Sequence, residues 1–300
     1  MFILFISVLI FGLVHPVSKL ILDQGIPLSY FCGLYVGIRF VFQFPVFFKK
    51  NNSRVSSKKI IYLLSLVGLV GAFLQFFEFK GIQIGMQPAL VTFIMYSYPT
   101  WILIINLFNK RHTFNILEAI QSILTVVGIF FVSHINFSSY DGFSWNLLYP
   151  LLASALIAAW IILSNRLRKE GVGSFELSAY YDLFSIFALL IIFNDSLVKD
   201  WPQFLFWSHD INHILGLIFY SLMIGLLPNL LFYFSSRNVS SNIAGTMMTF
   251  EPFFSALYST IIWKTTFDSH FVIGGIMIMF ANIPKEFFKK AFQCKLAHEG

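Results

Sequence analysis

The feature that most constrains this chain is a series of apolar segments that fills nearly its whole length. A helix of about 20 predominantly apolar residues spans the hydrocarbon core of a bilayer. Only 11% of the 300 residues are charged, against about 25% in a soluble domain. We therefore predict an all-α membrane protein. Its ten transmembrane helices are expected at 2–21, 29–48, 61–81, 89–108, 115–133, 146–165, 175–193, 211–233, 243–262 and 270–288.

The basic residues predict which way these helices run. Cytoplasmic loops of membrane proteins are enriched in Lys and Arg. With the N-terminus in the cytoplasm, 15 of the 20 Lys and Arg fall in inner loops or in the C-terminal tail. We expect a multi-pass protein of the inner (cytoplasmic) membrane with both termini in the cytoplasm. On this interpretation the net charge of +6 reports orientation, and we expect no nucleic-acid partner.

The two halves of the chain resemble each other around a proline. Pro99 lies mid-way along the fourth predicted helix and Pro252 mid-way along the ninth. Five helices carry a chain across the membrane, so a second set of five begins on the opposite side. The sequence therefore predicts two inverted five-helix repeats, 2–133 and 146–288, followed by a basic cytoplasmic tail, 289–300. Inverted repeats are an architecture of secondary transporters.

Several short motifs are similar to those of a known family. They are Phe11-Gly12, Arg39-Phe40, Tyr98-Pro99, Glu251-Pro252 and the glycines Gly128 and Gly274. With ten helices in two repeats, the chain resembles the EamA-type members of the drug/metabolite transporter superfamily. The resemblance implies a transporter fold and does not identify a substrate.

Polar residues within the apolar segments are the candidate functional residues. A charged side chain at mid-bilayer costs about 2.5–3.5 kcal/mol on insertion scales, so it is expected to face protein or water. Glu251 lies beside Pro252, which cannot donate a backbone hydrogen bond and weakens its helix turn. The pair is interpreted as a proton or substrate-amine site, or else as a hydrogen-bonded packing contact. Arg39 needs an anionic partner, either Glu251 or a substrate carboxylate, unless it is a structural charge.

A second group of polar residues lies in the outer halves of the first and third predicted helices. His15 and Lys19 share one helix face beside Pro16, and Gln75 and Glu78 share another. These two faces could meet as an outer gate or as a vestibule that attracts anions.

Three further residues complete the predicted set. Tyr98 and Asn229 are candidates for the wall of a central cavity. Asp182 is expected to pair with Arg166 or Arg168 in a structural contact.

The leading functional hypothesis is a secondary transporter, and we favour export. It would carry a small organic metabolite or amphipathic compound by alternating access, coupled to protons or to exchange. The sequence contains no ATP-binding or metal-binding motif, and we expect no enzyme activity, cofactor or metal. A membrane-embedded transferase and a non-transporting scaffold are the alternatives. The expected partners are the substrate, protons and the lipid bilayer, and the chain would act as a monomer or homodimer.

Overall fold

The fold was analysed in a computed structural model, which describes residues 1–45, 57–107, 116–133, 145–236 and 247–283. The described residues are helical or irregular and contain no strand. The first half comprises α1 (Phe2–Phe11), α2 (Val14–Leu22), α3 (Leu28–Gln43), α4 (Lys58–Gln83), α5 (Pro88–Met95), α6 (Tyr98–Leu107) and α7 (Ile116–Val132). The second half comprises the short helix η3 (Trp145–Leu147), α8 (Leu148–Lys169), α9 (Ser174–Ile192), α10 (Asn194–Lys199), α11 (Trp201–Ser208), α12 (Ile211–Phe219), the π-helix η4 (Tyr220–Leu226), α13 (Leu227–Ser236), α15 (Glu251–Trp263) and α16 (Ser269–Ala281).

These helices make the chain a multi-pass membrane protein. Six helical stretches in the described part are long and apolar enough to cross a bilayer. They are Phe2–Leu22, Lys58–Gln83, Pro88–Ile105, Trp145–Lys169, Ser174–Ile192 and Ile211–Phe232. Three shorter apolar helices lie at Leu28–Gln43, Ala119–Val132 and Ser269–Ala281. The count of ten helices and their inverted repetition stay predictions, because several expected spans run into residues outside the described part.

Three helical segments are interrupted, and a proline follows each interruption. Pro16 follows the turn between α1 and α2, and Pro99 follows the turn between α5 and α6. Pro252 lies in the first turn of α15, after the turn at Thr249 and Phe250. A proline has no backbone N–H and fits the first turn of a helix, where that donor has no partner. Each interruption leaves backbone carbonyls that need other partners.

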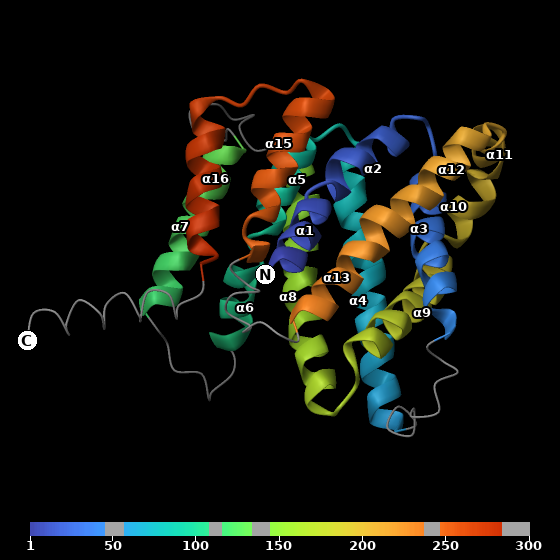
Figure 1. Ribbon diagram of the computed structural model, residues 1–300, viewed down its shortest axis with the longest axis horizontal. Helices are drawn as coiled ribbons and strands as arrows, with labels where there is room; N and C mark the ends of the chain where they lie inside the picture. The colour runs from blue at the N-terminus through green and yellow to red at the C-terminus, as the bar shows by residue number, and fades with distance from the viewer. Residues whose placement is uncertain (46–56, 108–115, 134–144, 237–246, 284–300) are drawn as a thin grey trace, which may run out of the picture.

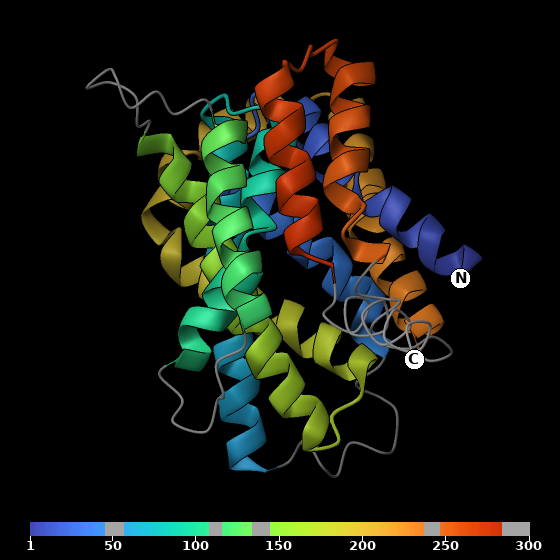
Figure 2. The ribbon, with the colours of Figure 1, turned by 90° about the vertical axis from the view of Figure 1, so that its left-hand side faces the viewer.

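The helices stand roughly side by side, as Figure 1 shows, with α7 and α16 at one end of the row and α10, α11 and α12 at the other. Figure 2 shows α7 and α16 running next to each other. Their contact depends on two glycines. A Cβ atom added to Gly274 would lie 2.6 Å from the carbonyl oxygen of Gly128, and one added to Gly128 would lie 2.8 Å from that of Gly274. Such close backbone approach between membrane helices requires small residues.

The connection between α9 and α12 consists of the two short helices α10 and α11, which pack over the start of α3. The Ser29 hydroxyl donates to Asp200 Oδ2 at 2.9 Å, and the Tyr30 hydroxyl donates to the Leu197 carbonyl at 2.6 Å. The rings of Tyr30 and Phe204 stack with their centroids 4.2 Å apart. This end of the molecule is therefore fixed to α3.

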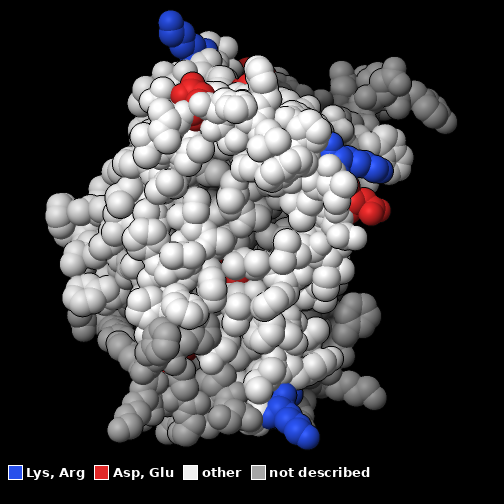
Figure 3. Space-filling view, turned by 90° about the vertical axis from the view of Figure 1, so that its right-hand side faces the viewer, with Lys and Arg blue, Asp and Glu red and all other residues white. Residues whose placement is uncertain are grey.

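Charged side chains gather toward two ends of the face in Figure 3, and most of the surface between them is uncharged. A small patch of acidic atoms is visible near mid-height among the uncharged ones. An uncharged band between charged ends is the surface expected of a protein that crosses a bilayer.

Candidate functional site

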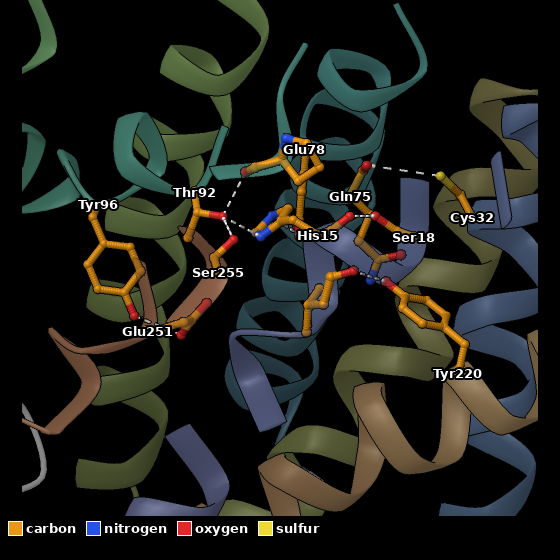
Figure 4. A network of polar contacts seen from close by, with 12 residues as sticks. His15, Ser18, Cys32, Gln75, Glu78, Thr92, Tyr96, Tyr220, Glu251 and Ser255 are labelled. Atoms are coloured by element: carbon orange, nitrogen blue, oxygen red, sulfur yellow. Dashed lines mark hydrogen bonds and ion pairs between the residues drawn. The ribbon is translucent and has the colours of Figure 1, made fainter. Parts of the chain in front are cut away.

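The interruptions of α5–α6 and of α15 face each other through Tyr96 and Glu251. The Tyr96 hydroxyl lies 2.7 Å from Glu251 Oε2 and 2.8 Å from the Met248 carbonyl oxygen, so its proton is shared between two acceptors. Figure 4 shows the tyrosine ring directed at the Glu251 carboxylate. Asn282 at the end of α16 donates to the Tyr96 carbonyl at 3.0 Å, which satisfies one acceptor freed by the break. The site is thus built from helix ends.

A second polar group lies beside this pair and joins four helices. His15 Nε2 is 2.9 Å from Glu78 Oε1, and His15 Nδ1 is 2.9 Å from the Thr92 hydroxyl. The Thr92 hydroxyl is in turn 2.8 Å from that of Ser255 and 2.9 Å from the Pro88 carbonyl. Figure 4 shows His15 in the middle of this chain of contacts. Because Ser255 lies one turn after Glu251 on α15, the two polar groups share that helix.

The two predicted faces of the first and third spans therefore do meet, through His15 and Glu78. The other members of these faces lie apart. Gln75 donates to the Tyr181 hydroxyl at 3.3 Å. Lys19 pairs with Asp23 at 3.0 Å near the end of α2.

Arg39 belongs to a different, fully buried cluster between α3 and α9. Its Nη2 lies 3.1 Å from Asp182 Oδ1, and its guanidinium stands 5.1 Å from the centre of the Tyr35 ring. Gln43, one turn further along α3, donates to Asp182 Oδ2. Arg39 is 6% exposed and Asp182 0%. Both side chains of this ion pair are therefore buried.

Two predicted pairings are wrong in consequence. Arg39 is paired with Asp182 and not with Glu251, and Asp182 is paired with Arg39 and not with Arg166 or Arg168. The reason is geometric, because α3 packs directly against α9. Arg166 and Arg168 lie in the last turn of α8, where both are exposed.

The remaining predicted residues are placed as follows. Tyr98 packs edge-to-face on Tyr96 with ring centroids 5.8 Å apart, next to Glu251. Asn229 donates to the carbonyl of Gly225 on its own helix at 2.7 Å, so its amide is used within the π-helical turn.

Sequence reasoning missed Thr92, Ser255, Gln43 and Asn282 as members of these clusters. A signal for two of them was present, since Thr92 precedes Tyr96 by one helical turn and Ser255 follows Glu251 by one. Polar side chains one turn apart in an apolar helix share a face. In α5 and α15 this polar face is the one that packs on the neighbouring helices.

Comparison with known proteins supports one family. Residues 144–283 match the EamA-like transporter family. This match covers most of the second half of the chain. The chain is also 25% identical over 208 residues to an uncharacterized transporter of Buchnera aphidicola subsp. Schizaphis graminum (strain Sg), and the alignment covers 68% of each protein. Both matches are to transporters, which supports a membrane transporter and confirms the resemblance to EamA-type drug/metabolite transporters.

The fold itself also has a solved counterpart. A crystal structure matches 94% of this chain and 94% of its own chain with a TM-score of 0.59 at 13% sequence identity. At that identity the likeness concerns the fold alone. Because the match covers 94% of this chain, it includes residues from both halves.

Proposed function

We propose that this chain is a secondary transporter that exports a small organic metabolite or amphipathic compound across the cytoplasmic membrane by alternating access. In this proposal ten helices form two inverted repeats, 2–133 and 146–288, with both termini and the tail 289–300 in the cytoplasm. One repeat rocks against the other, and transport is coupled to protons or to exchange. The chain does no chemistry on its substrate.

The observation that carries the proposal is the contact between Tyr96 and Glu251. Each residue lies at the break of an interrupted helix, one in each half of the chain. Secondary transporters build their binding sites near the bilayer midplane from discontinuous helices of the two repeats. Interrupted backbone and an ionisable group at such depth are expensive, and they are characteristic of ion and substrate sites.

The polar groups suggest a division of roles. Glu251 is only partly buried and has a tyrosine hydroxyl as its partner, so it is the group best placed to exchange a proton or to bind substrate. The pair of His15 and Glu78 is also enclosed, with side-chain exposures of 4% and 12%. It is connected to α15 through Thr92 and Ser255. Movement of α15 relative to α2 would therefore change the surroundings of both acids.

A metabolite-release experiment tests the proposal. Cells that lack related transporters would express the wild-type chain, Glu251→Gln or the control Glu170→Gln, and the small molecules in the medium would be compared by mass spectrometry. We expect at least one metabolite to accumulate with the wild type and with Glu170→Gln, and to be lost with Glu251→Gln at equal protein in the membrane. Identical media for all three, and for cells without the protein, would contradict transport.

A further inference from the structure

The buried arginine of the described helices is not available to a substrate. Arg39 is 3.1 Å from Asp182, and the same carboxylate accepts from Gln43. Both members of the ion pair are closed to solvent. Binding a substrate carboxylate at Arg39 would require this pair to break, which would leave Asp182 buried without a cation. Removing one partner of a buried ion pair is strongly unfavourable.

Glu251, the partly buried acid, differs from Arg39 in its surroundings. Within the described part of the chain, no lysine or arginine lies within ion-pair distance of Glu251, and its hydrogen-bond partner there is the Tyr96 hydroxyl. The neighbouring network adds Glu78 and one histidine, His15. The Tyr96–Glu251 contact and the neighbouring network thus hold two carboxylates against one imidazole. A positive ligand would balance this excess, and a negative one would increase it.

The aromatic side chains next to Glu251 favour the same class of ligand. Tyr96 donates to the carboxylate and packs on Tyr98, so two phenol rings adjoin the acid. Aromatic rings attract cations through their electron-rich faces, most strongly where water is excluded. A carboxylate beside aromatic rings is suited to a ligand with an ammonium group and an apolar body.

We propose that the substrate is an organic cation, a protonated amine with an apolar or aromatic body, whose ammonium group binds beside Glu251. The inference rests on the proposed transport function and names the charge of its substrate. It excludes simple carboxylates, since the arginine that could have bound them is used by Asp182. An ammonium group would donate to the Glu251 carboxylate and supply the missing positive charge.

Binding to the purified full-length protein tests this inference without requiring transport. Thermal unfolding would be followed with a panel of amines, including 2-phenylethylamine, each compared with the alcohol and the carboxylate of the same shape. We expect amines to raise the unfolding temperature up to a plateau as their concentration increases. The matching alcohols and carboxylates should leave the unfolding temperature unchanged. Since a hydrogen bond to a charged group contributes about 1.5–3 kcal/mol, Glu251→Gln should weaken amine binding by about tenfold or more. Glu170→Gln should leave it unchanged.

The outcomes separate this inference from the proposed function. Stabilisation by carboxylates, equal stabilisation by all three classes, stabilisation by no amine, or full amine binding in Glu251→Gln would each overturn it. The comparison of amine with carboxylate uses the wild type alone, so it stands even where the variant does not fold. In proteoliposomes, transport of an anion and not of the amine would contradict a cationic substrate but would still support the proposed transport function. Amine binding without any flux would contradict the proposed transport function but would still support a binding site for organic cations.

Discussion

Tyr96 and Glu251 are in contact, 2.7 Å apart, although they come from opposite halves of the chain. Both stand at helix breaks, so one hydrogen bond joins two places where the backbone is interrupted. A broken helix in a membrane is tolerated only where protein or water satisfies its free carbonyls. Here the Tyr96 hydroxyl and the Asn282 amide do so, by binding the carbonyls of Met248 and Tyr96.

Replacing Tyr96 by phenylalanine should weaken this junction while keeping the ring. Glu251 and the Met248 carbonyl would lose their shared donor, and an unsatisfied buried acceptor costs about 1–3 kcal/mol. We expect Tyr96→Phe to lower the thermal stability, and to do so by less when Glu251→Gln is already present. A double-mutant cycle of thermal unfolding measures this coupling. Strictly additive effects would mean that the hydrogen bond is not formed.

The ion pair between Arg39 and Asp182 should behave as a unit. Arg39→Gln or Asp182→Asn alone leaves an unpaired buried charge, and such losses cost about 3–5 kcal/mol. The double variant removes both charges and should be markedly more stable than either single variant. Unfolding of the purified proteins in detergent compares the three. If the double variant were as unstable as the sum of the singles, the two side chains would not be partners in the membrane.

The packing of α7 on α16 should not tolerate a larger residue at its closest point. A Cβ atom at Gly274 would lie 2.6 Å from a backbone oxygen, and overpacking of this kind costs about 1–3 kcal/mol. Gly274→Ala should therefore lower the unfolding temperature. Gly33→Ala is the matched control, because a Cβ atom there meets nothing within 4 Å. Equal effects of the two alanines would contradict the observed helix contact.

The orientation of the chain makes a separate prediction. Both Lys50 and Lys289 lie outside the described residues, and the distribution of basic residues in the sequence predicts a cytoplasmic position for each. Cysteines introduced at these positions, with Cys32 and Cys294 replaced, should react with a membrane-impermeant thiol reagent only after the cells are opened. Labelling of one position but not the other in intact cells would contradict the predicted arrangement of two inverted five-helix repeats.

The sequence identifies polar residues within the apolar segments, but it does not identify all of their partners. Glu251 and Arg39 stand out because a charge in an apolar segment is costly, and Pro252 beside Glu251 marks a helix break. The meeting of His15 with Glu78 was foreseeable because both lie in the outer halves of neighbouring spans. The pairing of Arg39 with Asp182 was not, because it depends on how α3 crosses α9. That crossing is set by contacts far apart in the sequence.

Hydroxyl groups present a different difficulty. Thr92 and Ser255 lie in apolar helices, where such groups commonly bond to their own backbone one turn earlier. The Thr92 hydroxyl does contact the Pro88 carbonyl, and it also contacts His15 and Ser255. Only the packing of α2 and α15 on α5 shows these additional contacts. The membrane class of the chain, by contrast, follows from composition and segment length alone.

The most direct test of the central role of Glu251 is transport by purified protein in proteoliposomes, measured across pH for an amine that the wild type binds. Glu170→Gln is the control, because the Lys59 ammonium hydrogen-bonds to the exposed Glu170 carboxyl and lowers its pKa. Glu170 therefore stays ionised at neutral pH, and its contribution would be lost only as the pH falls through that lowered pKa. We predict that the wild type and this control transport with the same pH-dependent rate, and that Glu251→Gln loses the flux or its pH dependence. An unchanged rate and pH profile in Glu251→Gln would contradict the account.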